Sequence, residues 1–375
     1  MFSLNVFLKK HKSNLTTEIL AALTTFFTMA YILVVNPSIL GAAGLPPDAV
    51  FTATALAAGF GCIIMGFLSN KPLAVACGMG ENAYFAYTVV IAMGIAWPAA
   101  LAAVFVAAAL IFIIAYSKID ISQAMPESLK HAIVGALGLF LVFIGLQNAH
   151  FVVPNSATIV ALGDLTQPIT HIGLISLAII LFLMARGFKG AIFVGIVLTT
   201  IIAILVGYSP VPQGIFGFPP SPDQILFKID FSALAKLSLL PVIWTIFILS
   251  FFDTLGSNLA LISKTVHIHK SVKNSNTGAV VPGFRKALEA DGIAGMLAAL
   301  FGVSSVITFL ESATGIQAGG KTGITAIGVG ILFLFALFFF PLIKAIPIEA
   351  AAPGIIIVGL LMLGGIDKIK YSDET

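Results

Sequence analysis

Four acidic residues lie within long apolar runs of this sequence: Glu81, Asp253, Asp291 and Glu311. A carboxyl group in the centre of a bilayer is costly, so such a residue is by default a functional hypothesis. No lysine or arginine lies in the middle of these runs. Burial disfavours the charged form of an unpaired carboxyl, so such a group can be neutral or charged at physiological pH. The pattern therefore indicates proton coupling.

The four acids do not predict the same role. Glu311 is the strongest candidate for a ligand contact, because one carboxylate can accept two N–H groups of a planar ligand. Asp253 could bind the ligand or a proton, or lock two helices together, and these alternatives stay open. Asp291 lies near Arg285 and is interpreted as a structural partner. Beside Glu81, Asn82 offers a donor and an acceptor, although it could instead cap a helix.

Two polar, glycine-containing segments interrupt the apolar pattern, at residues 71–85 and 302–313. In both, a short extended apolar stretch leads into a helix whose start carries an acid. Interrupted spans at matching positions of an inverted repeat indicate a transporter's binding site. Gly78 and Gly80 permit a sharp entry and a close approach of the backbone, although small residues also serve helix packing in membranes.

Other side chains give weaker indications of function. Phe26, Phe27, Phe85 and Phe309 could stack on a flat ring, but taken singly each is more readily a lipid-facing or core residue. Glu18 is interpreted as an acid at the start of a helix. The six histidines form no cluster with metal-ligand spacing, so neither a metal nor a cofactor is expected.

The composition places these residues in a membrane protein. Of 375 residues, 59% are hydrophobic and 9% are charged, and the mean hydropathy is +1.09. A soluble chain of this length would have too few charges to cover its surface. This excludes a soluble enzyme, a nucleic-acid-binding protein and a disordered chain. With only Cys62 and Cys77, it also excludes a secreted disulfide scaffold.

Hydropathy predicts an all-α polytopic membrane protein with about twelve spans, of which the third and tenth are short and broken. The apolar runs are continuous, which disfavours an alternating β-barrel. The predicted spans are residues 17–35, 50–68, 79–94, 98–116, 129–147, 170–185, 190–208, 239–262, 285–302, 305–319, 323–343 and 346–363.

The basic residues predict the orientation. If the N-terminus is cytoplasmic, the outer segments hold only Lys228, Lys236 and Lys344 of the 19 lysines and arginines. This sorting agrees with the excess of positive charge on cytoplasmic loops. It predicts that both termini are cytoplasmic, that residues 263–284 form a solvated cytoplasmic loop, and that the proline-rich residues 209–238 form an ordered or extended outer loop.

Four segments carry a resemblance to a known family, at residues 15–32, 78–87, 252–256 and 309–323. They include Gly-Met-Gly-Glu-Asn-Ala-Tyr-Phe from Gly78 and Phe-Leu-Glu-Ser-Ala-Thr-Gly from Phe309. In this order along the chain, the sequence resembles the AzgA-like adenine/guanine/hypoxanthine permeases, a branch of the nucleobase:cation symporters with the uracil-transporter fold.

The resemblance implies a seven-plus-seven inverted repeat and proton symport of a purine nucleobase at the cell membrane by a rocking or elevator-like motion. It implies a core domain from residues 1–116 and 237–343 and a gate domain from residues 117–236 and 344–375. The partners it implies are a purine, protons, the lipid bilayer and a second copy of the chain. The candidate substrate-binding residues are Glu311, Asn82, Ser250, Asp253, Phe309 and Gly80. The candidate proton-coupling residues are Glu81, Asp253 and Glu311.

The sequence departs from the family pattern in three places. The family has an acid at the position of Ser250 and an apolar residue at that of Glu81. We therefore expect Glu81 to replace the missing acid. The family also continues with two more helices after the last predicted span. We accordingly expect an incomplete second gate segment, in a fragment, a natural short form or a chain that depends on a partner.

Three alternatives compete with purine transport. An anion carrier of the same fold would require a cationic or purely dipolar site rather than acids beside the ligand. An intramembrane aspartyl protease would require two facing aspartates, but the expected Tyr-Asp and Gly-x-Gly-Asp contexts are absent. A membrane sensor or subunit without transport activity is the third.

Overall fold

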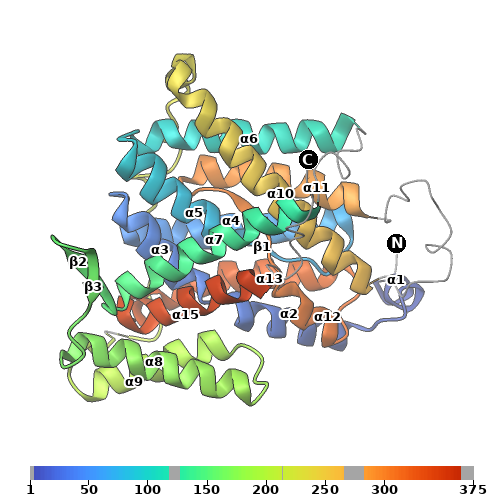
Figure 1. The fold of residues 1–375 in the computed structure, drawn as a ribbon. Coiled ribbons are helices and arrows are strands. Elements are labelled where there is room, and N and C mark those ends of the chain that lie inside the picture. The colour runs from blue at the N-terminus through green and yellow to red at the C-terminus, as the bar shows by residue number, and fades with distance from the viewer. Residues whose placement is uncertain (1–3, 118–126, 213, 266–282, 365–375) are drawn as a thin grey trace.

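The structure is a computed structural model that describes residues 4–117, 127–212, 214–265 and 283–364. Its helices lie side by side in one bundle (Figure 1). Within the described residues, six helical segments are long and apolar enough to cross a membrane, and three further apolar helices are shorter. The chain is therefore a multi-pass membrane protein. The total of twelve spans and the orientation stay predictions, and most of the predicted cytoplasmic loop at 263–284 lies outside the described residues.

The first part of the chain forms a helical unit around one short strand. A short helix, α1 (Leu4–Lys10), precedes it. Tyr31 separates the first two membrane helices, and a π-helical segment continues the helix that follows the strand. The elements are α2 (Leu15–Met29), α3 (Ile32–Ala42), α4 (Pro47–Ser69), β1 (Val75–Cys77), α5 (Met79–Ala83), η1 (Tyr84–Ala92) and α6 (Trp97–Ser117).

The later part of the chain repeats this plan. A long helix and a second helix lead to a short strand, a short helix and another long helix. The elements are α10 (Leu240–Thr265), α11 (Phe284–Phe301), β4 (Val306–Thr308), α12 (Ser312–Gln317), α13 (Gly323–Ala336), η5 (Leu337–Phe339) and α14 (Phe340–Lys344).

These two parts pack on one another through small residues. Helix α4 lies between α13 and α11, and α11 also packs along α6. A Cβ on Gly330 would lie 2.5 Å from the carbonyl oxygen of Gly59, and one on Gly66 would lie 2.5 Å from that of Gly323. The backbones of α4 and α13 therefore touch at two points one heptad apart. Dispersion at such close contacts holds helices together where lipid removes the hydrophobic driving force.

The two short strands depart from the all-α prediction. β1 and β4 pair antiparallel, with Ala76 opposite Ile307. The pairing continues at both ends, where the N–H of Gly78 donates to the carbonyl of Ser305 (2.9 Å) and that of Phe309 to the carbonyl of Ala74 (2.9 Å). The sequence predicted extended stretches here but not their pairing. The physical reason is that buried backbone away from water must find hydrogen bonds within the protein.

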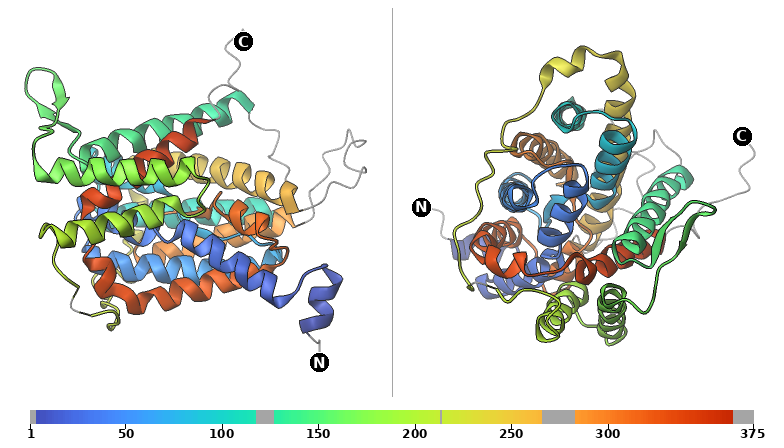
Figure 2. Two further views of the ribbon diagram at one scale, coloured as in Figure 1. Left: turned by 90° about the horizontal axis from the view of Figure 1, so that it is seen from below. Right: turned by 90° about the vertical axis from the view of Figure 1, so that its left-hand side faces the viewer.

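A second group of helices covers one side of the bundle (Figure 2). Helix α15 packs along α7 and α8, and α8 packs on α9. The backbones of α7 and α15 meet at Gly138 and Gly359. The elements are α7 (Glu127–Asn148), the hairpin β2 (Val152–Asn155) and β3 (Ile159–Leu162), α8 (Pro168–Ala185), α9 (Ala191–Leu205) and α15 (Ile348–Met362).

The proline-rich segment between α9 and α10 contains only two short 3₁₀ helices, η2 (Phe231–Ala235) and η3 (Leu237–Leu239), among its described residues. It is attached to the bundle where the Thr52 hydroxyl donates to the carbonyl of Pro220 (2.8 Å). The predicted ordered or extended conformation agrees with this arrangement. That it faces outward stays a prediction, as do the boundaries of the core and gate domains.

Candidate functional site

A cavity of about 710 Å³ lies between the two groups of helices. One wall comes from Tyr31, α5, α10 and the segment after β4, and the other comes from α7 and α15. The second wall is apolar, with Val134, Val358, Leu361 and Met362. The polar chemistry of the cavity therefore comes almost entirely from the interrupted segment at β4 and from α10.

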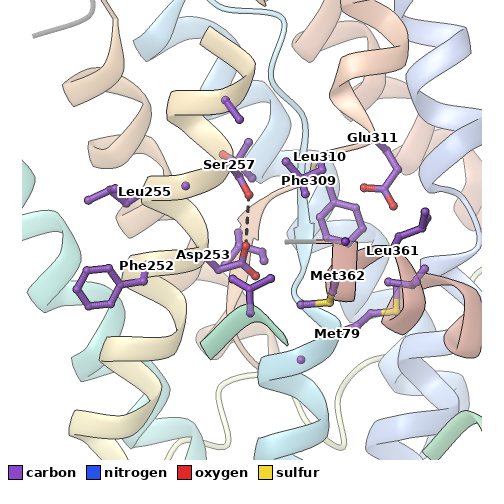
Figure 3. A pocket seen from close by; sticks show the side chains of 18 of the residues that line it. Met79, Phe252, Asp253, Leu255, Ser257, Phe309, Leu310, Glu311, Leu361 and Met362 are labelled. Atoms are coloured by element: carbon purple, nitrogen blue, oxygen red, sulfur yellow. Dashed lines mark hydrogen bonds between the residues drawn. The ribbon is translucent and has the colours of Figure 1, made fainter. Parts of the chain in front are cut away.

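Glu311 lies at the end of the extended segment, where it immediately precedes α12. Its side chain points into the cavity (Figure 3). The buried hydroxyl of Tyr31 donates a hydrogen bond of 2.6 Å to Glu311 Oε1. Because Tyr31 lies at the break between α2 and α3, that break and the second interrupted segment together fix the direction of the carboxyl. The structure thus places the predicted ligand-binding acid in the cavity wall.

Asp253 reaches the cavity from the middle of α10. The hydroxyl of Ser257, one turn later, donates to Asp253 Oδ1 at 3.3 Å. In Figure 3, Asp253 and Glu311 lie on either side of Phe309. Phe309 and Gly80 also line the cavity. Four of the six candidate substrate-binding residues are therefore brought together.

Asn82 is fully buried and is not part of the cavity wall. Its amide nitrogen donates to the side-chain oxygen of Asn36, and its own oxygen accepts from the hydroxyl of Ser304. The Asn36 amide in turn donates to Thr54 (2.7 Å). The side chain does not cap a helix, since Gly78 occupies the N-cap of α5. Contact between Asn82 and a ligand stays a prediction that requires these bonds to open.

Ser250 and Glu81 also lie behind the cavity wall. The Ser250 hydroxyl donates to that of Ser305 at 3.0 Å, and the residue is buried. Glu81, in the first turn of α5, is 2% exposed. Neither of its carboxyl oxygens has a hydrogen-bond partner among the described residues. Both residues are therefore buried, and neither is among the residues that line the cavity.

Asp291 forms structural hydrogen bonds, and its partners lie on other elements rather than at the nearby Arg285. It accepts hydrogen bonds from the Asn258 amide (2.7 Å) and from the Thr308 hydroxyl (3.0 Å). Glu289 instead pairs with Lys286 at 2.6 Å. Asp291 therefore joins α11 to α10 and β4. The expected link to Arg285 is not formed among the described residues, because a side chain at this helix position faces α10 rather than its own helix start.

The sequence did not single out Tyr31, Asn36, Thr308 or Ser304 as parts of the site. Tyr31 and Asn36 both lie within one apolar span of 28 residues, Leu15–Ala42, which contains α2, the break at Tyr31 and α3. A tyrosine and an asparagine in the middle of such a stretch need hydrogen-bond partners, and this signal could have identified them.

Residues 16–375 match the model of the Permease family. The chain is 41% identical to a putative permease of Methanocaldococcus jannaschii, over 98% of this chain and 83% of that protein. It is 36% identical to the adenine permease AdeQ of Escherichia coli, over 98% of this chain and 82% of that protein. It is 37% identical to the guanine/hypoxanthine permease PbuO of Bacillus subtilis, over 98% of this chain and 85% of that protein.

A solved structure shares the fold. The transmembrane domain of a cyanobacterium bicarbonate transporter, BicA, superposes with a TM-score of 0.68 at 19% identity, covering 96% of this chain and 92% of that chain. At this level of identity the likeness concerns the fold alone. It indicates that the arrangement of helices described above is that of a polytopic transporter.

Proposed function

Since the chain belongs to the Permease family, we propose that it imports purine nucleobases (hypoxanthine, guanine or adenine) across the cell membrane by proton symport. Two of its relatives are named adenine permease and guanine/hypoxanthine permease. Nearly the whole chain aligns with them. The resemblance of the motifs around Asn82 and Glu311 supports the same substrate class.

The observation that carries the proposal is that Glu311, Phe309 and Asp253 all line one cavity (Figure 3). A carboxylate accepts N–H donors in charge-assisted hydrogen bonds, and an aromatic ring stacks on a flat heterocycle. Pockets of about 300–1,000 Å³ suit small organic ligands. A purine has both the N–H edge and the flat face that such a site would recognise.

The position of the cavity supports transport by alternating access. It separates the helices of residues 1–116 and 237–343, our proposed core, from those of residues 117–236 and 344–375, our proposed gate. Movement of one group against the other would open the cavity to either side of the membrane. Asp253, Glu311 and Glu81 are the proposed proton-coupling acids, and both termini are proposed to be cytoplasmic.

An anion carrier is the competing function of the same fold. Among the described residues that line the cavity, two are acids and none is lysine, arginine or histidine. Carboxylates beside a bound anion would repel it. The chemistry of the wall therefore favours a ligand with N–H donors over sulfate or bicarbonate.

The test is uptake of labelled adenine, guanine, hypoxanthine and uracil in a transport-deficient cell, with and without a proton uncoupler. We expect purine uptake that the uncoupler abolishes and that excess unlabelled purine, but not sulfate, competes away. Competition by sulfate, or absence of purine uptake by folded protein in the membrane, would overturn the proposal.

A further inference from the structure

Glu81 is the buried acid whose setting the cavity does not explain. It lies behind the cavity wall, 2% exposed, and both carboxyl oxygens have no hydrogen-bond partner among the described residues. An ionised carboxylate in such a setting is strongly penalised, and the group either takes up a proton or binds a cation. The burial of Glu81 therefore favours a neutralised carboxyl, which carries a proton or has a cation bound to it.

The side chain of Ile307 lies between the Glu81 carboxyl and the cavity. The Glu81 carboxyl folds back over the backbone of Gly78, where the side chain of Ile307 closes the space. Ile307 is itself a wall residue of the cavity. Helix α10, which carries Asp253 in the wall, packs on α5, which carries Glu81. The Glu81 carboxyl therefore lies next to one residue of the cavity wall, on a helix that packs against the helix of Asp253.

Among the described residues, few other ionisable groups lie near Glu81. Helices α3, α7 and α10 and the segment η1 pack on α5. Helix α3 contains no ionisable residue, and α7 contains none from Val134 to Asn148. The segment η1 contributes Tyr84 and Tyr87, and the acid on α10 is Asp253. Asp253 is therefore the only other acid on these parts of the elements packed on α5.

A short chain of contacts links Glu81 to the helix of Asp253. The Ser250 hydroxyl donates to Ser305 (3.0 Å), and the Ser305 carbonyl accepts from the N–H of Gly78 (2.9 Å). Gly78 is the residue against which the Glu81 carboxyl lies. Ser250 is three residues before Asp253, so it shares a face of α10 with it. A carboxyl placed at residue 250 would therefore reach the same region from the opposite helix.

We propose that Glu81 and Asp253 form the coupling site of this transporter, with Glu81 holding the proton behind Ile307 and exchanging it with Asp253 at the cavity wall. The inference rests on the proposed function, which it deepens by naming the residue that stores the proton. In the exchange, the O–H bond on Glu81 breaks and one on an Asp253 oxygen forms. During this transfer the pair keeps one negative charge. Asp253, in the cavity wall, then takes up the next proton from the cavity on one side of the membrane, and the pair releases a proton through Asp253 to the cavity on the other side.

The first test separates coupling from substrate recognition. Glu81→Gln keeps the shape of the side chain but cannot release a proton. Proton-driven accumulation of hypoxanthine should fall by at least about tenfold. Exchange of labelled for unlabelled hypoxanthine in vesicles without a proton gradient should stay within about threefold of the unsubstituted protein, since the cavity wall is unchanged. Adding Ser250→Asp to Glu81→Gln should restore part of the accumulation.

A matched control and a spectroscopic measurement complete the design. Glu289→Gln removes a buried acid that pairs with Lys286 away from the cavity, and it should leave accumulation unchanged. In purified protein, the infrared C=O band of a protonated carboxyl should shrink in Glu81→Gln and persist in Glu289→Gln. This infrared measurement does not depend on any transported substrate.

The outcomes distinguish the two proposals. Wild-type accumulation by Glu81→Gln, or an infrared band that Glu81→Gln leaves intact, would overturn the coupling role of Glu81 even if purine transport is confirmed. Accumulation that requires Na⁺ and ignores the uncoupler would overturn proton storage in favour of a cation site. If the infrared band shrinks in Glu81→Gln but the unsubstituted protein transports no purine, the proton on Glu81 is supported and the proposed function is refuted.

Discussion

The two interrupted segments of the chain have the same plan and different surroundings. In each, a three-residue strand leads into a short helix with an acid at its start. After β4, Glu311 faces the cavity and its carboxyl is fixed by Tyr31. After β1, Glu81 is enclosed and has no hydrogen-bond partner in the described part of the chain, and Asn82 is held by Asn36 and Ser304.

The difference indicates a division of roles. A carboxyl that is oriented by a hydrogen bond and borders a cavity suits ligand recognition. A carboxyl without partners, behind the cavity wall, suits proton storage. The first half of the repeat would then supply coupling and rigidity, and the second half would supply the contact surface for the ligand.

The largest expected effect is that of Glu311→Gln. It replaces a charged acceptor by an amide, and each lost charge-assisted hydrogen bond is worth about 1.5–3 kcal/mol. Hypoxanthine binding to the purified protein should weaken at least about tenfold for each bond lost, as measured by calorimetry. Glu289→Gln is the matched control. Unchanged binding would show that the second half does not recognise the ligand.

The next effect is on stability. Asn82→Ala removes the hydrogen-bond partner of the buried side-chain oxygen of Asn36 and that of the buried Ser304 hydroxyl, at about 1–3 kcal/mol for each group. The melting temperature of the protein in detergent should therefore fall clearly. A variant that keeps its melting temperature but loses hypoxanthine binding would place Asn82 at the ligand, and the proposed division between the halves would fail.

A smaller effect is expected for Tyr31→Phe. This change removes only the hydroxyl that orients Glu311, and a neutral donor to a charged group contributes about 1.5–3 kcal/mol. Hypoxanthine binding should weaken by about tenfold, less than in Glu311→Gln, while proton dependence is retained. Equal losses in the two variants would mean that Tyr31 itself contacts the ligand.

The smallest effect is expected for Asp164→Asn, in the loop before α8. Hydrogen bonds from Thr166 and Gln167 lower the pKa of Asp164 to about 2. The charged form contributes its hydrogen bonds above the unfolded-state pKa, and they are lost only as the pH falls through about 2. The pH profile of uptake between pH 5 and pH 8 should therefore match that of the unsubstituted protein. A displaced profile would mean that acids outside the bundle contribute to coupling.

Much of the fold could be predicted from the sequence because hydropathy and backbone chemistry are local. Continuous apolar runs predicted the membrane helices, and Gly78 and Gly80 marked one of the breaks. The pairing of β1 with β4 could not be predicted in the same way. It joins residues more than 200 positions apart, and no local pattern encodes that register.

The difference between local patterns and distant contacts also explains how far the environment of each acid could be predicted. The amino-acid sequence was enough to predict that carboxyl groups are enclosed in a membrane protein, and to identify the segments that carry them. Which of these carboxyl groups have hydrogen-bond partners became visible only in the folded chain. Glu18 receives hydrogen bonds from Ser13 (2.6 Å) and Thr325 (2.5 Å), whereas Glu81 receives none from the described residues. A hydrogen bond depends on which distant segments meet, and the packing of the helices decides that.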